Sequence, residues 1–112
     1  MLQHQDPLDH AFQALSDSTR RRLVERLSAG PMSVSDLAGP LPMSLSAVMQ
    51  HLKVLEAAGL VRSEKVGRVR TCRVEPGALT AAEHWLNARR RSVERGLDRL
   101  GVFLDATKPE GE

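Results

Sequence analysis

Two prolines within three residues, Pro40 and Pro42, separate two segments that each begin with a serine suited to cap a helix. Neither proline can continue a helix, because each lacks an amide donor and restricts the residue before it. In the first segment Ser33 can accept from the free amides of a first turn, and Asp36 follows at the third helical position. Ser44 is the corresponding cap of the second segment. The chain must therefore form two helices joined by a sharp turn.

The second of these helices, over residues 44–58, has two unlike faces. Its inward residues recur at helical spacing, and Gly59 ends the segment as a left-handed cap would; they are Leu45, Val48, Leu52 and Leu55. The other face carries small or hydrogen-bonding side chains, namely Ser46, Met49, Gln50 and Lys53, with Ser44 at its start. Such side chains fit against base edges in a DNA major groove. We therefore expect this helix to contact DNA.

A basic hairpin is expected at residues 62–74, with Val66, Val69 and Val74 in two strands around a turn near Gly67. Five basic residues against one acid, Glu64, give it a local charge above the formal +2 of the chain; they are Arg62, Lys65, Arg68, Arg70 and Arg73. Taken alone, a solvated basic hairpin is an equal alternative. After two helices, contact with phosphates is favoured, chiefly through Lys65, Arg68 and Arg70. The predicted fold is mainly α with a two-stranded β-wing, a winged helix-turn-helix.

Residues 14–22, 33–38 and 51–61, followed by the wing, resemble the ArsR family of bacterial winged-helix repressors. The resemblance covers about residues 8–105, and residues 51–61 are its most specific part. It implies a homodimer that binds an operator palindrome in double-stranded DNA and represses transcription until a signal weakens binding. The chain looks most like the metal-independent branch, whose last helix carries a Trp-Leu pair, here Trp85-Leu86, and a Leu-Asp-Arg-Leu segment, here residues 97–100.

The metal chemistry of the family does not carry over to this chain. Its arsenic- and cadmium-sensing members place two cysteines around a valine before an Asp-Leu pair, because thiolates hold thiophilic ions. Those positions are Ser33 and Ser35 here. The zinc-type members use paired acidic and histidine positions on the last helix, where this chain has Glu83-His84 and no later histidine. We expect no metal and no cofactor.

Apolar stripes near both ends of the chain are the expected dimer interface. A helix opened by Asp6-Pro7 carries the first stripe, which consists of Leu8, Ala11, Phe12 and Leu15. The last helix is expected to start near Leu79, and its stripe recurs at spacings of seven, four, three and four residues, as a helix–helix seam requires; it consists of Leu86, Val93, Leu97, Leu100 and Leu104. Packing within the same domain is the alternative. The last helix extends beyond what a small domain can cover, which favours a seam between subunits.

At 112 residues the chain is expected to form one domain over residues 1–106 and a disordered tail over 107–112. One cysteine cannot form an internal disulfide. No apolar run reaches the roughly 18 residues of a membrane span, and no signal peptide is evident, so we expect a cytoplasmic protein. Cys72 is best explained as a small buried strand residue. A redox-responsive regulator is the alternative, since oxidation would place a bulky group beside Arg70 and Arg73.

Two arginine clusters and a histidine lie outside the expected set of DNA-contacting residues. At most one or two of Arg20, Arg21 and Arg22 can reach phosphate, and the others should pair with acids or lie in solvent. The cluster at residues 89–91 is expected to be solvated, and His51 should make a structural hydrogen bond.

No nucleophile arrangement or phosphate-binding loop suggests an enzyme. The first hypothesis is a dimeric DNA-binding regulator, and the second is a protein-interaction adaptor of the same fold that has lost DNA binding. Leu45 and Met49 motivate the adaptor, because the family often has polar residues there; the basic wing argues against it. The effector is unknown: a small ligand at the dimer interface, a protein partner and no effector all remain open.

Overall fold

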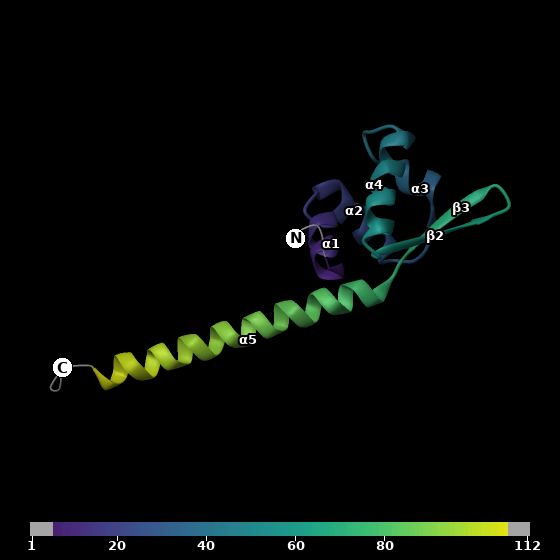
Figure 1. The fold of residues 1–112 in the computed structure, drawn as a ribbon. Coiled ribbons are helices and arrows are strands. Elements are labelled where there is room, and N and C mark those ends of the chain that lie inside the picture. The colour runs from purple at the N-terminus through teal and green to yellow at the C-terminus, as the bar shows by residue number, and fades with distance from the viewer. Residues whose placement is uncertain (1–5, 108–112) are drawn as a thin grey trace, which may run out of the picture. The chain divides into compact units, whose positions relative to one another are not determined.

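The computed structural model describes residues 6–107. In chain order the elements are α1 (Pro7–Ala14), α2 (Ser18–Leu27), β1 (Met32–Ser33), α3 (Val34–Ala38), α4 (Leu45–Ala57), β2 (Val61–Val66), β3 (Val69–Val74) and α5 (Pro76–Ala106) (Figure 1). The chain has two parts, one through Ala82 and the other from Glu83 onward. The expected single domain over residues 1–106 stays a prediction.

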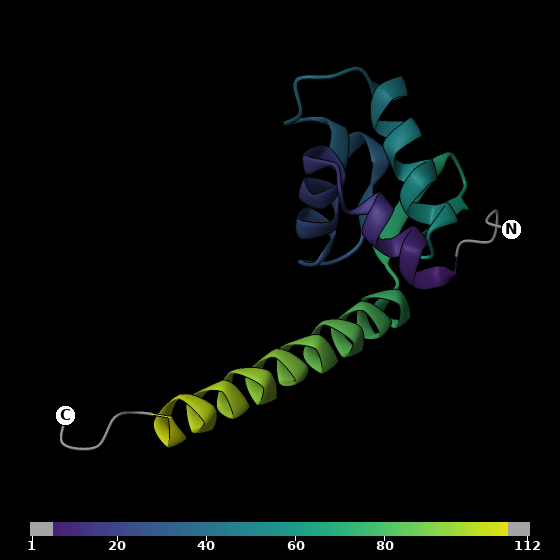
Figure 2. The same cartoon turned by 60° about the vertical axis from the view of Figure 1, so that its left-hand side comes forward.

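Helices α1 and α2 begin where the sequence places them. Asp6 Oδ1 accepts from the Asp9 amide at 2.9 Å, and Pro7 occupies the first helical position of α1. Asp17 Oδ2 accepts from the Arg20 amide at 3.0 Å and caps α2. Both helices pack against α4, as two directions of view show (Figures 1 and 2).

The two capping serines also act as predicted. Ser33 Oγ accepts from the Asp36 amide at 3.1 Å at the start of α3, and Ser44 Oγ accepts from the Ala47 amide at 3.1 Å at the start of α4. Between them the chain turns through residues 39–44, which contain both prolines. The expected pair of helices around a proline turn is confirmed.

The end of α4 is a glycine cap of the Schellman type. Gly59 has a φ of +75°, its amide donates to the Glu56 carbonyl oxygen at 2.9 Å, and the Leu60 amide donates to the Leu55 carbonyl oxygen at 2.9 Å. These two bonds satisfy carbonyl groups that the helix leaves without an internal partner. They also turn the chain directly into β2.

The wing is the predicted antiparallel hairpin, with Gly67 at a φ of +63° in its turn. The sheet has a third strand that the sequence analysis did not predict. Strand β1 pairs with β3, Met32 opposite Cys72 and Ser33 opposite Thr71, so the strand order is β1-β3-β2. Two residues are too few to show the alternation by which a strand is recognised in a sequence.

One hydrophobic core holds the part through Ala82 together. Side chains from the first four helices meet Leu60, Val61 and Cys72 there, and Ala78 and Leu79 at the start of α5 pack against it. On α4 the inward residues Val48, Leu52 and Leu55 are buried as expected. The prediction for Leu45 is wrong, because 50 % of its surface is exposed.

Helix α5 begins at Pro76, earlier than the expected start near Leu79, because proline is well suited to the first helical position. Of all the residues in α5, each of which the structure describes, only Ala82 is buried. At the other end the Thr107 amide donates to the Phe103 carbonyl oxygen at 3.1 Å. The expected disordered tail over 107–112 stays a prediction, and residues 108–112 lie outside the described part of the chain.

The cap of α4 gives a stability prediction. Replacing Gly59 with alanine should lower the free energy of unfolding by about 1 kcal/mol, because an L-residue is strained at positive φ even where its Cβ meets no neighbour. The control is Gly77→Ala in the first turn of α5, where a Cβ also has room. We expect that variant to be as stable as the parent or slightly more stable. Urea denaturation compares them, and equal stability of the two variants would contradict the left-handed cap.

Candidate nucleic-acid interface

The register of the wing assigns its basic residues to two faces. Residues directly opposite each other in an antiparallel pair share a face, and faces alternate along each strand. One face carries the pairs Val61–Val74, Ser63–Cys72 and Lys65–Arg70. It is buried at Val61 and Cys72, so this is the face that packs on the core. Lys65 and Arg70 therefore lie on the core-facing side of the hairpin, nearer to its exposed turn than Ser63 and Cys72.

The other face of the wing carries Arg62 opposite Arg73 and Glu64 opposite Thr71. Arg62 is engaged locally, because its Nε lies 3.1 Å from Glu75 Oε2. An ion pair at this position offsets the repulsion between two arginines placed directly across from each other. Of the two arginines on this face, Arg62 is therefore held by an acid just after the hairpin.

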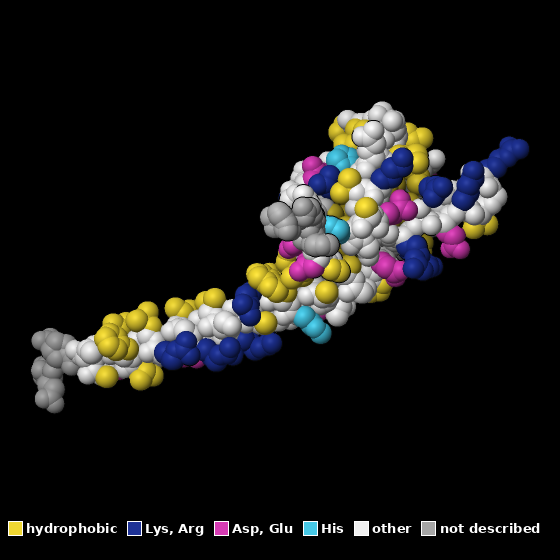
Figure 3. Space-filling view, viewed as in Figure 1, with side chains coloured by type: hydrophobic (Ala, Val, Ile, Leu, Met, Phe, Trp, Pro, Cys, Tyr) yellow, Lys and Arg dark blue, Asp and Glu magenta, His cyan; other side chains and the backbone are white. Residues whose placement is uncertain are grey.

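A groove of about 450 Å³ lies between the wing and the starts of α3 and α4. It brings together four of the predicted DNA-contacting residues, Met49, Lys65, Arg68 and Arg70; the other lining residues are Ser33, Val34, Ser35, Leu45 and Val69. Lys and Arg side chains gather along the hairpin in the space-filling view (Figure 3). The groove thus has a helical wall and a basic wall.

A second depression runs along the outward face of α4 and holds Ser46, Met49, Gln50 and Lys53 together with Leu45. Because both depressions include Leu45 and Met49, they form one continuous surface. Ser46, Gln50 and Lys53 are exposed there, whereas Met49 is half-buried and packs partly against the core. Leu45 lies on this surface because it is the first residue of α4, one turn before the core-facing Val48.

Three of the basic side chains on this surface have no polar partner in the part of the chain that the structure describes. Across residues 6–107, Lys53, Lys65 and Arg68 make no side-chain hydrogen bond or ion pair. Ser44 is also exposed, and its Oγ already accepts the capping bond from Ala47. Its hydroxyl proton remains available to donate.

Two residues that bond to this surface without lining it, Ser63 and Glu56, were not among the predicted site residues. The Ser63 hydroxyl donates to Glu56 Oε1 at 2.6 Å and accepts from a terminal guanidinium nitrogen of Arg70 at 3.0 Å. One sequence signal could have indicated Ser63: it lies two residues after Val61, so both share the core-facing side of the strand. Its contacts depend on the way α4 and the wing pack, which the sequence does not state.

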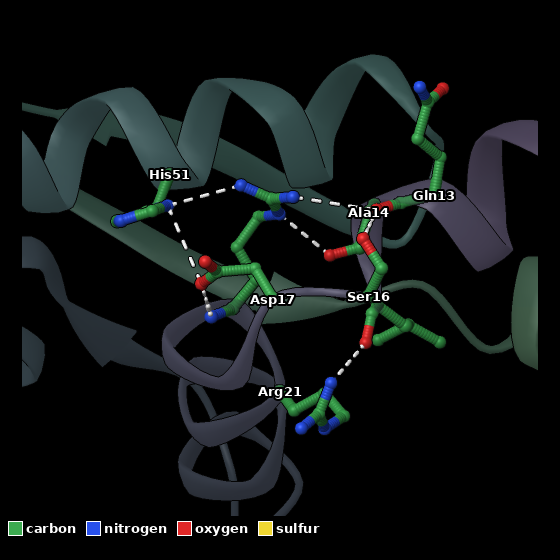
Figure 4. Close-up of polar contacts among 8 residues, drawn as sticks. Gln13, Ala14, Ser16, Asp17, Arg21 and His51 are labelled. Carbon is green, nitrogen blue, oxygen red and sulfur yellow. Dashed lines mark hydrogen bonds and ion pairs between the residues drawn. The ribbon is translucent and has the colours of Figure 1, made fainter.

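We expected the arginines of this cluster that do not reach phosphate to pair with acids or lie in solvent. Arg20 and Arg21 instead donate to carbonyl groups at the end of α1 (Figure 4). Arg20 Nε donates to the Ala14 carbonyl oxygen at 2.6 Å, and a terminal nitrogen of Arg21 donates to that of Leu15 at 2.7 Å. The last carbonyls of a helix lack internal partners, which makes them good acceptors for a guanidinium. These two arginines are therefore structural.

The expected structural hydrogen bond of His51 is present in the same cluster. A second nitrogen of Arg20 lies 3.3 Å from His51 Nδ1, which is also 4.0 Å from Asp17 Oδ2 (Figure 4). The hydrogen bond from the Arg20 amide lowers the pKa of Asp17, and the charge of Arg20 lowers it further, against an opposing effect of desolvation. Asp17 thus caps α2 and lies beside His51 of α4.

Cys72 is fully buried at the centre of the sheet. Burial raises the pKa of its thiol, and the Glu56 carboxylate raises it further, against an opposing effect of Arg70. A cavity of about 130 Å³ beside it is lined by Val34, Met49, Leu52, Lys53, Glu56 and Arg70. A buried neutral thiol is a poor nucleophile, which favours the structural interpretation of Cys72 over the redox alternative.

Between residues 6 and 107, no three His, Cys, Asp or Glu side chains lie close enough together to bind a metal ion. Within the same range, no helix combines the length and apolar character needed to cross a membrane.

The model of a helix-turn-helix domain matches residues 15–64. The HTH-type transcriptional regulator Rv2034 of Mycobacterium tuberculosis is 51% identical over 73 residues, which are 65% of this chain and 68% of that protein. The transcriptional repressor SdpR of Bacillus subtilis is 30% identical over 61 residues, 54% of this chain and 68% of the repressor.

Two solved structures are similar to the chain as well. The crystal structure of an ArsR family transcriptional regulator has a TM-score of 0.76 and 46% identity, and the match covers 80% of this chain and 98% of that one. An ArsR-like transcriptional regulator from Rhodococcus sp. RHA1 has a TM-score of 0.72 and 35% identity, over 90% and 92% of the two chains. The similar proteins are transcriptional regulators and not enzymes.

The environment of Cys72 predicts slow modification. At a given pH a raised pKa leaves less thiolate, and burial blocks access, so an aromatic disulfide reagent at pH 8 should label the native protein at least about tenfold more slowly than the protein in denaturant. Absorbance of the released thiol measures both rates. Equally fast labelling of the native protein would revive the redox alternative.

Proposed function

The chain belongs to the ArsR family of transcriptional regulators, and we propose that it is a homodimeric repressor of its own or an adjacent operon, with α4 in the major groove and the wing on the flanking backbone or minor groove. The observation that carries this proposal is the continuous surface on which the outward residues of α4 and the basic residues of the wing meet. Its site of action would be the cytoplasm, where the DNA of a bacterium lies.

The α4 side of this surface suits base edges. Ser46, Gln50 and Lys53 are exposed and can exchange hydrogen bonds with bases, while the half-buried Met49 can contact the methyl group of a thymine. Ser44 lies at the start of the helix, where free amides and the helix dipole favour a phosphate. We assign these five residues to DNA contact.

The wing side suits phosphates. Lys65 and Arg70 lie on the core-facing side of the hairpin, and Arg68 lies in its turn, next to Gly67. A lysine or arginine that neutralises a phosphate releases counterions, so such contacts contribute affinity without reading sequence. We assign these three residues to the DNA backbone.

The proposed dimer uses the apolar stripe of α5. Leu86, Val93, Leu97, Leu100 and Leu104 are each 50–60% exposed in the single chain. A second copy packed along this seam would remove them from water, and the two-fold symmetry of such a pair would match a palindromic operator. Leu8 and Phe12 of α1, both half-buried, complete the proposed interface.

The adaptor hypothesis rests on Met49, which is half-buried, and on Leu45, whose apolar side chain is half exposed on the same surface. Three unpaired basic residues around it, Lys53, Lys65 and Arg68, favour the DNA interpretation, because an apolar protein partner would leave them buried without counter-charges. Ser33 and Ser35 lack the thiolates that thiophilic ions need, and we propose that no such ion is the signal that releases this repressor.

The wing prediction concerns DNA affinity and its salt dependence. In Arg68→Ala/Arg70→Ala, the slope of log K against log salt for DNA upstream of its own gene should flatten by roughly 0.9 for each phosphate that is no longer neutralised, hence by up to about 4 in a dimer. Arg73→Ala on the other face is the matched control and should keep most of the slope. Fluorescence anisotropy at several salt concentrations measures this. No binding by the parent protein at low salt, or no effect of the double substitution, would reject the assignment.

The dimer prediction concerns self-association. Leu97→Glu should raise the dimer dissociation constant at least about 100-fold, since each buried leucine contributes roughly 1.5–3 kcal/mol and a dimer contains two. Val102→Glu is the control, because Val102 is 69% exposed and lies on the opposite side of the same helix. Sedimentation equilibrium distinguishes them. A monomeric parent, or equal effects of both substitutions, would exclude this seam.

A further inference from the structure

A chain of two hydrogen bonds ties the last turn of α4 to both strands of the wing. It runs from Arg70 on β3 through the Ser63 hydroxyl on β2 to Glu56 on α4, over 3.0 Å and 2.6 Å. We infer that Ser63 is a positioning residue that holds the Arg70 guanidinium ready for a DNA phosphate. This inference rests on the proposed function and adds to it two residues, Ser63 and Glu56, that themselves need not touch DNA.

The chemistry of the three groups fixes the direction of the bonds. A guanidinium can only donate and a carboxylate can only accept, whereas a hydroxyl does both. Arg70 therefore donates to Ser63, and Ser63 donates to Glu56. Because each bond has a charged group at one end, both are of the stronger, charge-assisted kind, and each polarises the other.

Ser63 lies at the boundary between the buried and the exposed parts of the wing. It lies directly opposite the buried Cys72 and on the same face as Lys65 and Arg70, which extend into the groove. Glu56 and Arg70 also line the small cavity beside Cys72, together with Met49 and Lys53 of α4. The bonded chain thus lies next to two of the residues proposed to read bases.

The hydroxyl also keeps two opposite charges apart. Arg70 and Glu56 both bond to Ser63, yet they form no ion pair with each other. One N–H of the guanidinium is held by Ser63, and the other donors of Arg70 remain available at the wall of the groove. A direct Arg70–Glu56 pair would instead use two parallel N–H groups and turn the charge away from DNA.

Without the hydroxyl, Arg70 has two alternatives, and both weaken DNA binding. It can move freely in solvent, so that binding must then pay for ordering a long side chain. It can also pair with Glu56, in which case the two charges neutralise each other. In either state Arg70 neutralises a DNA phosphate less effectively.

The test compares Ser63→Val with Ser63→Thr, which have nearly the same shape, both suit a strand, and differ in the hydroxyl. Binding to a mixed-sequence DNA duplex is measured by anisotropy from low to high salt, because phosphate contacts do not depend on sequence. We expect S63V to lose about three- to tenfold in affinity at low salt and to flatten the salt slope toward that of Arg70→Ala. S63T should stay close to the parent, and S63V/R70A should equal R70A alone.

Thermal unfolding of each variant controls for folding, and Ser63→Ala replaces S63V if the valine is not accommodated. A parent-like slope in S63V, with binding still weakened by R70A, would overturn the role of Ser63 and leave the proposed function intact. Effects that add in S63V/R70A would also overturn it, because Ser63 would then act independently of Arg70. No DNA binding by the parent protein would overturn the proposed function and this inference with it.

Discussion

The burial of one face of α4 is the constraint on which the rest of this structure depends. Val48 and Leu55 are completely excluded from solvent and Leu52 nearly so, which fixes the rotation of the helix about its axis. The α4 residues that lie between these buried positions in the sequence and on the other side of the helix, such as Gln50 and Lys53, must then face outward. A rotation of one residue step would bury Lys53 and expose Leu52, at a cost that no surface contact offsets. The same burial that stabilises the domain therefore decides which side chains are presented to a partner.

The glycine cap extends this constraint to the wing. Gly59 turns the chain immediately after α4, and the next two residues, Leu60 and Val61, are buried. Helix and hairpin thus share one core, and little chain lies between them that can vary in length or direction. Ser63 adds a polar tie at the point where this shared core ends. The angle between helix and wing is accordingly set by packing first and by hydrogen bonds second.

Features that depend on residues close together in the sequence were predictable. Features that depend on contacts between residues far apart in the sequence were not. The caps at Ser33 and Ser44, the turn at Gly67 and the buried face of α4 follow from local signals, and all are present. Strand β1 exists only because β3, which is distant in the sequence, comes to lie beside it. Arg20 and Arg21 bind carbonyls because of the way α1 and α2 are joined. Leu45 fits the helical period but lies one turn beyond the core, whose extent no periodicity reveals.

The unequal width of the sheet has a mechanical consequence. Strand β3 is paired on both sides at Thr71 and Cys72, with β1 and with β2. From Arg70 to the turn at Gly67 it has β2 alone. Backbone held by two neighbours opens less readily than backbone held by one. The hairpin is therefore held most firmly at Thr71 and Cys72, and less firmly from Arg70 to the turn. Its outer end, which carries Arg68, is accordingly the part of the wing that we expect to bend most readily.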